Sequence, residues 1–381
     1  MTFTINTLRA GAVLSLALLA GCSMFSSKKP RLEPAPLLSF KPSMVVRTLW
    51  TADVGKSGGY FLSPSLSDGK VYAAATNGKV SALDAVTGKP VWTATVDADL
   101  SAGVGADAAT VAVASAQGTL FAFDAATGKQ RWKTRLSTEV LSAPAVGSGV
   151  VIVRSMDNKI VAYDVETGNR RWVVQRTAPA LVLRAAPGIV INDGMAYVAL
   201  PAGRLLAISA ATGVARWDAP VAEPRGATEL ERVADVSGTP ALLGREICAT
   251  SYQGRIACID AGNGSLRWAR EFSADVGPAI DQRYVFGADE QGTVAGFSRD
   301  TGGSLWRSTS LSGRGLSAPV SYGRAVVVGD KEGYLHFLSR EEGAMLARIN
   351  LGDQDRAAPV VAGANLIVQT RDGKLVALTS E

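Results

Sequence analysis

Short apolar runs, each closed by a polar turn, recur along most of the chain. The run VVIVRS precedes Asp157, for example, and the run KIVAYD follows it. Runs of this length between turn residues are typical of strands that are buried on both faces. No helical periodicity is visible. The pattern therefore predicts an all-β protein built from short antiparallel strands.

One recurring phrase accounts for this pattern. It reads NGKVSALDAVTGKPVW from residue 77, QGTLFAFDAATGKQRW from residue 117 and DNKIVAYDVETGNRRW from residue 157. Full copies start at residues 77, 117, 157, 202, 253, 291 and 332, and a truncated copy starts at residue 372. A period of roughly 40 to 50 residues is typical of stacked supersecondary units.

Each part of the phrase has a structural role. The opening Asn-Gly or Gln-Gly pair suits a tight hairpin turn, because glycine adopts positive φ. The following strand carries a small residue at one position in most copies: Ala82, Ala122, Ala162, Ala207, Cys258, Gly296 and Ala377. The segment Asp-x-x-Thr-Gly predicts a second turn. A tryptophan closes the phrase at positions 92, 132, 172, 217, 268 and 306, whereas the seventh copy has Ala347.

Two further apolar runs precede each phrase, so the repeating unit is predicted to be a four-stranded antiparallel sheet. Eight such sheets can bury both faces when they are arranged radially. We therefore predict an eight-bladed β-propeller over residues 46–381, with a seven-bladed ring as the alternative. Trp50 follows no phrase, and the last phrase lacks its tryptophan strand. The strand around Trp50 is expected to complete the last blade and close the ring.

The N-terminal residues predict targeting rather than fold. Arg9 precedes the apolar run AGAVLSLALLAG, which is too short to cross a bilayer of ~30 Å and suits a secretory signal peptide over residues 1–21. Leu19-Ala20-Gly21-Cys22 resembles the lipobox of bacterial lipoproteins. The resemblance implies lipid on Cys22, and Ser23 after it implies the outer membrane; an ordinary signal peptide is the alternative. Four prolines and four basic residues between 26 and 45 predict an extended, flexible tether over residues 22–45.

Composition excludes several functional classes. The formal net charge is +5, but the basic residues are scattered, so we predict no nucleic-acid partner. The chain has one histidine, His336, which falls within a predicted strand and is read as structural. No haem-attachment or metal-ligand spacing is present, and Asp84 and its equivalents recur as turn residues. We therefore predict no catalytic residue, no metal and no cofactor.

The phrase A-x-D-x-x-T-G-x-x-x-W resembles the repeat of quinoprotein dehydrogenases and their relatives. A lipoprotein of this length with little besides blades is similar to the BamB family within that superfamily. The resemblance implies a non-enzymatic scaffold on the periplasmic face of the outer membrane of a Gram-negative bacterium. It also implies binding to the barrel-assembly subunit BamA and to unfolded outer-membrane clients. A PQQ-dependent (quinoprotein) dehydrogenase and an envelope polysaccharide-binding propeller are the alternatives.

The spacing between tryptophans breaks in two places, at 45 and 51 residues, where loops lengthen between consecutive blades. Lengthened loops on a regular scaffold often carry function. Leu181, Leu183 and Arg184 lie in the first, and Asp235 follows a densely charged stretch in the second. The resemblance implies that these four residues contact BamA. Ser237 stands where the BamB family often has an aspartate.

Cys248 and Cys258 flank a hairpin turn at Gln253-Gly254. A three-residue loop places the two cysteines opposite each other, where a disulfide is possible in an oxidising compartment. A two-residue loop sends them to opposite faces of the sheet and leaves two small buried thiols. The sequence leaves both registers open.

Overall fold

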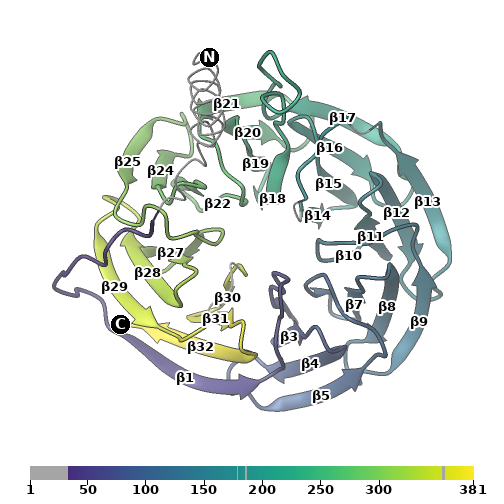
Figure 1. The fold of residues 1–381 in the computed structure, drawn as a ribbon. Helices are drawn as coiled ribbons and strands as arrows, with labels where there is room; N and C mark the ends of the chain where they lie inside the picture. Colours follow the sequence, from purple (N-terminus) through teal and green to yellow (C-terminus); the bar gives the residue numbers. More distant parts are fainter. Residues whose placement is uncertain (1–32, 178, 185–186, 354–356) are drawn as a thin grey trace, which may run out of the picture.

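The computed structural model describes residues 33–177, 179–184, 187–353 and 357–381. Across these residues, 32 strands form eight four-stranded antiparallel sheets. Figure 1 shows the sheets arranged as blades around a central axis. The described residues include no helix. The prediction of an all-β, eight-bladed propeller is confirmed.

In each blade the first strand lies at the axis and the fourth lies at the rim (Figure 1). Blade one contains β2 Ser65–Ser67, β3 Lys70–Ala74, β4 Lys79–Asp84 and β5 Pro90–Thr95, and blade two contains β6 Gly105–Ala106, β7 Thr110–Ala114, β8 Thr119–Asp124 and β9 Gln130–Arg135. Blade three contains β10 Ala145–Gly147, β11 Val150–Arg154, β12 Lys159–Asp164 and β13 Arg170–Gln175, and blade four contains β14 Ile189–Asn192, β15 Met195–Leu200, β16 Arg204–Ser209 and β17 Ala215–Pro220. Blade five contains β18 Val236–Leu243, β19 Glu246–Ser251, β20 Arg255–Asp260 and β21 Leu266–Glu271, and blade six contains β22 Ala279–Ile280, β23 Tyr284–Ala288, β24 Val294–Ser298 and β25 Ser304–Ser308. Blade seven contains β26 Val320–Tyr322, β27 Ala325–Gly329, β28 Tyr334–Ser339 and β29 Met345–Asn350, and blade eight contains β30 Val360–Ala362, β31 Asn365–Gln369, β32 Lys374–Ser380 and β1 Val46–Asp53.

The last blade is completed by the first strand of the chain. Its order is β1-β32-β31-β30, and β1 pairs antiparallel with β32 from Val46↔Ser380 to Asp53↔Lys374. Trp50 stands opposite Ala377, as each repeat tryptophan stands opposite a small residue of its own blade. The expected closure by the two ends of the chain is confirmed.

The repeat tryptophans lock each blade to the next. Trp132 of blade two pairs with Ala122, and its indole Nε1 donates to the carbonyl oxygen of Val165 in blade three at 2.9 Å. Its ring covers Gly168, where φ is +71° and a Cβ would lie 2.6 Å from the ring. The glycine of the Asp-x-x-Thr-Gly turn is thus needed both for the left-handed turn and for the tryptophan that rests on it.

Blade seven departs from this rule for a physical reason. Ala347 replaces the tryptophan, and Phe337 replaces the small residue opposite it. The rim strand of blade eight, β1, comes from the other end of the chain, so β32 is not joined to it by an Asp-x-x-Thr-Gly turn on which a tryptophan could rest. Met44, which is 4% exposed, packs in the same cluster as Phe337 and Ala347. A residue from the N-terminal segment therefore shares the interface that a tryptophan fills elsewhere.

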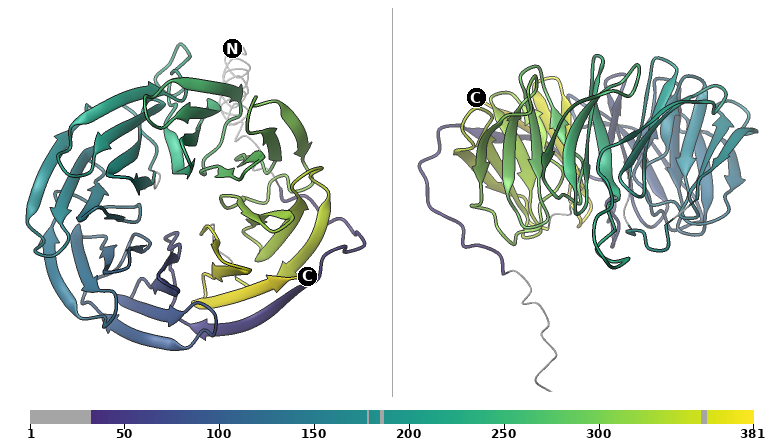
Figure 2. Two further views of the ribbon diagram at one scale, coloured as in Figure 1. Left: turned by 180° about the vertical axis from the view of Figure 1, so that it is seen from behind. Right: turned by 90° about the horizontal axis from the view of Figure 1, so that it is seen from above.

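The direction of the chain through each blade gives the two faces of the disc different connections. Asp-x-x-Thr-Gly turns join the third strand to the fourth on one face. The opposite face carries the connections from the rim strand of one blade to the axial strand of the next, and we call it the loop face. Its two longest connections are residues 176–188, between β13 and β14, and residues 221–235, between β17 and β18. Teal to green loops project below the disc in the side view (Figure 2).

The described part of the predicted tether, residues 33–45, lies against blade seven. The amides of Ser43 and Met44 donate to the carbonyl oxygen of Leu346 in β29, at 3.0 and 3.3 Å. The predicted signal peptide and Cys22 lie outside the described residues. Over the part of the chain that is described, no helix has the length and apolar character needed to span a membrane.

Candidate protein-docking site

The two lengthened connections meet on the loop face. Asp235, at the end of the second connection, accepts a hydrogen bond from the backbone amide of Leu183 in the first, with 2.7 Å between Oδ2 and N. Its other oxygen accepts from the backbone amide of Ala202 at 3.1 Å. A single carboxylate therefore ties the first connection to the turn between β15 and β16.

Asp235 is itself buried, at 6% exposed. Its backbone carbonyl accepts from the amide of Tyr252 and from the hydroxyl of Ser237, which is also buried. Arg154, 9% exposed, lies nearby in β11 and donates to the carbonyl oxygen of Ala199 at 2.8 Å. Burial lowers the pKa of Arg154 to about 10, and the charge of Asp235 opposes that shift. Asp235 thus supports residues 181–184 from beneath, and we call these four residues the docking segment.

Three side chains of the first connection, those of Leu181, Val182 and Arg184, are exposed. Leu181 is 46% exposed and Val182 is 37% exposed, so adjacent apolar side chains stand in solvent. Leu183 is half-buried. Arg184 donates from Nη2 to Oε2 of Glu139 at 2.7 Å, although the arginine side chain is 67% exposed. The exposed apolar pair with an oriented guanidinium has the composition of a protein-docking surface.

Glu139 was not predicted from the sequence. It lies in the connection between β9 and β10, so the candidate site spans three consecutive connections on the loop face. Its side chain is 20% exposed, and its backbone carbonyl accepts from the amide of Met156 at 3.1 Å. This connection has an ordinary length, so no spacing signal in the sequence marks it.

The charged stretch in the second connection, residues 227–232, is ordered by hydrogen bonds and an ion pair. Oε2 of Glu231 accepts from the amides of Ala227 and Thr228, at 2.8 and 3.1 Å. These bonds, with that from Thr228 first, lower the pKa of the Glu231 carboxyl. Arg232 pairs with Glu229 at 3.6 Å. Leu230, 69% exposed, stands among these charges and adds an apolar side chain to the same face.

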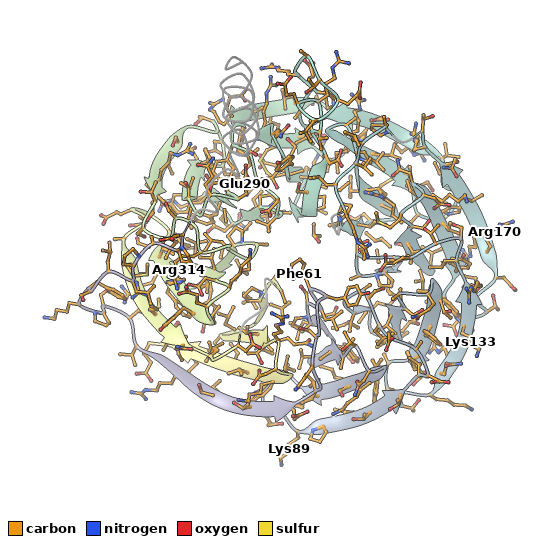
Figure 3. The ribbon with its side chains drawn as sticks, in the orientation of Figure 1. Phe61, Lys89, Lys133, Arg170, Glu290 and Arg314 are labelled. Atoms are coloured by element: carbon orange, nitrogen blue, oxygen red, sulfur yellow. A yellow bond between two sulfur atoms is a disulfide. The ribbon has the colours of Figure 1, made fainter. Side chains whose placement is uncertain are left out.

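A cavity of about 740 Å³ runs along the axis beside the docking segment. Leu183 and Arg184 line it together with small residues and prolines from the starts of the axial strands. Phe61, 50% exposed, points toward the axis (Figure 3). Lys89, Lys133 and Arg170 lie at the rim, far from it (Figure 3).

The axial cavity does not fit the quinone of a quinoprotein dehydrogenase. A calcium-bound quinone over a tryptophan floor requires an indole and several oxygen ligands for the cation. The chain has seven tryptophans, and all seven lie in rim strands. Among the described residues that line the cavity, the one carboxylate is that of Asp275. We therefore derive no reaction at the axis.

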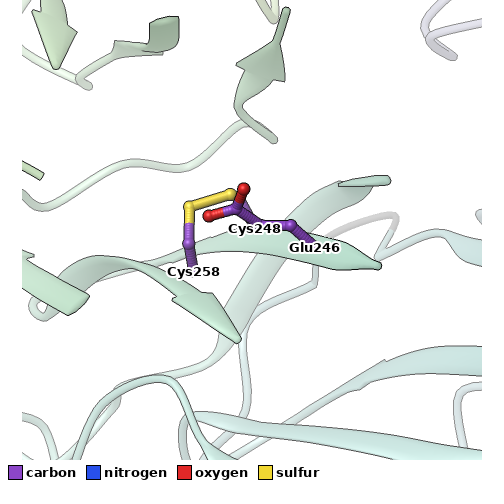
Figure 4. A group of neighbouring side chains, drawn as sticks. All are labelled: Glu246, Cys248 and Cys258. Atoms are coloured by element: carbon purple, nitrogen blue, oxygen red, sulfur yellow. A yellow bond between two sulfur atoms is a disulfide. The ribbon is translucent and has the colours of Figure 1, made fainter. Parts of the chain in front are cut away.

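The structure places Cys248 of β19 opposite Cys258 of β20, which is the register of the three-residue loop. It joins their sulfur atoms in a disulfide beside Glu246 (Figure 4). These three side chains are close enough to hold a metal ion. Paired sulfurs offer no thiolate, however, and Glu246 already contacts Arg299 at 2.7 Å and Arg267 at 3.6 Å. The arrangement is therefore structural.

A second concentration of charge lies buried in blade seven. Oδ2 of Asp330 accepts from Nε of Arg314 at 2.5 Å and contacts Nε2 of His336 at 2.8 Å. Nε of Arg348 donates to the other ring nitrogen of His336 at 3.3 Å. A histidine that donates through Nε2 and accepts at Nδ1 is neutral. His336 is fully buried in β28, where the sequence placed it as a structural residue.

The stability of the protein is expected to fall as the pH drops below about 6.5. Burial lowers the pKa of His336, and the hydrogen bond to Asp330 only partly opposes this shift. The unfolded chain therefore takes up a proton on His336 before the folded chain does, so acid favours unfolding. Thermal midpoints measured between about pH 7.5 and 5.5 should decrease for wild type and stay nearly flat for His336→Gln. An equal decrease in both proteins would contradict a neutral His336.

The fold defines a class, the eight-bladed propellers built from quinoprotein-type repeats. Quinohemoprotein alcohol dehydrogenase from Comamonas testosteroni has this fold, with a TM-score of 0.68 and 16% identity over 88% of this chain and 76% of that one. The family described as "Outer membrane protein assembly factor BamB" matches residues 47–101, 77–308 and 290–381. The chain belongs to the BamB family.

Individual relatives agree with this placement. The chain is 45% identical to a BamB from Bordetella pertussis over 96% of both chains. It is 46% identical to one from Pseudomonas aeruginosa, over 97% of this chain and 98% of that protein, and 34% identical to one from Escherichia coli, over 96% and 97%. The crystal structure of BamB from Moraxella catarrhalis matches with a TM-score of 0.80 and 26% identity, over 88% of this chain and all of that one. The relatives from Bordetella pertussis, Pseudomonas aeruginosa and Escherichia coli are named outer membrane protein assembly factors, which confirms the prediction of a scaffold rather than an enzyme.

Proposed function

We propose that this protein is a scaffold of the outer-membrane β-barrel assembly machinery and that BamA docks on its loop face. The relatives' names support the role in outer-membrane protein assembly. One structural observation supports the docking site: Leu181 and Val182 are exposed in a segment whose backbone is held by the buried Asp235. An ordered apolar segment loses little conformational entropy on binding.

The charges around the segment support specific recognition. Glu139 fixes the direction of Arg184 and engages one of its terminal nitrogens, which leaves the rest of an exposed guanidinium for the partner. The ordered stretch at residues 227–232 places both signs of charge on the same loop face. Apolar anchors inside a polar rim are typical of protein interfaces. The proposal also includes a lipid on Cys22 that anchors the scaffold to the outer membrane.

The docking site is tested by a double substitution that places glutamate at two exposed positions. Leu181→Glu combined with Arg184→Glu should weaken binding of the BamA periplasmic domain at least about 10-fold, because an apolar anchor and its cation are both lost. Leu266→Glu is the matched control, since Leu266 is 54% exposed on the rim strand β21. Titration calorimetry with the three proteins measures the effect. Equal affinities for wild type and the double variant would eliminate the site.

A second variant separates support from contact at Asp235. Asp235→Ala removes the acceptor for the amides of Leu183 and Ala202. We expect faster hydrogen exchange at Leu183 and affinity for BamA reduced by roughly 10-fold, the loss of preorganisation. Lost binding with unchanged exchange at Leu183 would instead make Asp235 a direct contact.

A further inference from the structure

The described N-terminal segment, residues 33–45, forms a strap along the rim of blade seven. The amide of Ala35 donates to the carbonyl oxygen of Ser312 at 2.8 Å, and the amide of Ser43 donates to that of Leu346 at 3.0 Å. Between these points Phe40 is half-buried, and beyond them Met44 enters the core. Residues 35–43, which read as part of a flexible tether in the sequence, are thus held at both ends.

Three arginines donate hydrogen bonds to the backbone of the strap and so clamp it: Arg324 and Arg348 of blade seven, and Arg314 of the connection that precedes it. Nη1 of Arg314 donates to the carbonyl oxygen of Ala35 at 3.0 Å, and Nη1 of Arg348 donates to that of Leu38 at 3.3 Å. Arg324 donates to the carbonyl oxygen of Ser43. The guanidinium of Arg348 also lies 5.2 Å from the centre of the Phe40 ring, a cation–π distance.

Two of the three clamp arginines, Arg314 and Arg348, are held in place by further side chains. The side chain of Arg314 is 2% exposed and pairs with both Asp330 and Glu332 at 2.5 Å. Arg348 is held by His336, the one histidine of the chain. A buried charge network without a catalytic role in the fold therefore has a structural one, because it presents rigid donors to the strap.

The strap begins on the loop face. Ser312 belongs to the connection between β25 and β26, the same class of connection as residues 176–188 that carries the docking segment. The strap then runs along the rim to Val46, where β1 starts on the opposite face. In the side view its purple trace descends to the side of the disc from which the teal and green loops project (Figure 2).

We propose that the strap and its arginine clamp orient the propeller on the membrane, with the loop face and its docking site toward the bilayer. This inference rests on the lipid anchor at Cys22 that is part of the proposed function. Residues 22 to 33 span at most roughly 40 Å when extended. With the strap docked, the loop face is held within that distance of the bilayer. With the strap released, residues 22 to 46 reach roughly twice as far and either face can turn to the membrane.

The clamp is tested by proteolysis of the strap. Arg348→Ala should speed chymotrypsin cleavage after Phe40 at least about 10-fold, because cleavage requires local release of the segment. Lys89→Ala, on the exposed rim, is the matched control and should leave the rate unchanged. Thermal midpoints check that both variants are folded, and Phe40→Ala, which should expose cleavage after Leu38, repeats the test from the strap side. Equal cleavage rates in wild type and Arg348→Ala would overturn the clamp.

The orientation is tested with the full-length lipidated protein in phospholipid vesicles that carry a headgroup energy acceptor. Donor dyes are placed at Ala227 on the loop face and at Val86, 70% exposed on the opposite face. We expect transfer at Ala227 at least about twice that at Val86, and a much smaller difference in Arg348→Ala. Equal transfer at both sites in the wild-type background would overturn the proposal. Orientation that persists while BamA fails to bind would refute the docking function and leave the strap inference standing.

Discussion

Asp330→Ala should lower the free energy of unfolding by about 3–5 kcal/mol. The carboxylate is fully buried and holds Arg314, which is 2% exposed, together with the neutral His336. Without it the buried guanidinium keeps only the half-exposed Glu332 as an ion-pair partner, which costs far more than losing a surface ion pair. Denaturant unfolding followed by tryptophan fluorescence measures the loss.

Asp289 provides the matched control for Asp330. It occupies the equivalent turn of blade six, where Oδ1 accepts from the amides of Gln291 and Thr293. Oδ1 of Asp330 makes the same two bonds, to the amides of Glu332 and Tyr334. Asp289→Ala therefore removes the same turn hydrogen bonds but no buried ion pair. It should lower the free energy of unfolding by only about 0.5–1.5 kcal/mol. Equal losses in the two variants would show that the buried charge network contributes nothing.

Trp132→Ala should also cost about 3–5 kcal/mol, because the indole fills the interface between two blades. The side chain is 8% exposed and touches the turn of blade three at Gly168 and the carbonyl of Val165. Its removal leaves a cavity that the rigid sheets on either side cannot close. Denaturant unfolding measures the loss.

The hydrogen bond of the indole is separated from its volume by a matched pair of phenylalanine variants. Trp132→Phe leaves the carbonyl of Val165 without its donor, at a cost of about 1–3 kcal/mol. The indole nitrogen of Trp50 is buried without a hydrogen-bond partner, so Trp50→Phe removes an unsatisfied group and should cost clearly less. Equal costs would contradict the assignment of the blade-to-blade bond.

The blades and their closure could be predicted because the repeat is local. A turn glycine, a small residue and a tryptophan recur within each phrase, and each fixes a contact with its own or the next blade. The unmatched Trp50 and the truncated last phrase likewise predicted how the ring closes. Such features depend on neighbours in sequence and on their period, and both can be read from one chain.

The details of the docking site depend on contacts across blades, so the sequence predicted them only in part. The lengthened spacing marked the two connections, and the family resemblance singled out Leu181, Leu183, Arg184 and Asp235 within them. In the structure, a hydrogen bond between Leu183 and Asp235 joins the two segments. That Asp235 is buried, and that Glu139 orients Arg184, follows from the packing of three separate connections. Neither leaves a pattern within its own segment.

The docking of the strap and the register of the two cysteines could not be predicted from the sequence. Prolines between residues 34 and 42 indicate extended chain, which is correct, but not that arginines 270 or more residues later would hold it. The placement of Cys248 opposite Cys258 depends on a one-residue difference in loop length. The sequence repeat carries no information on contacts between distant segments or on a strand register that depends on one residue.

The central claim is that a closed ring offers a protein-docking surface on its loop face. Photo-crosslinking in cells tests it most directly, with the crosslinker at Val182 on the loop face and, in a separate strain, at Val86 on the opposite face. Both side chains are exposed, so neither position disturbs the core. We predict a crosslink to BamA from Val182 and none from Val86. A crosslink from Val86 with none from Val182 would contradict the account.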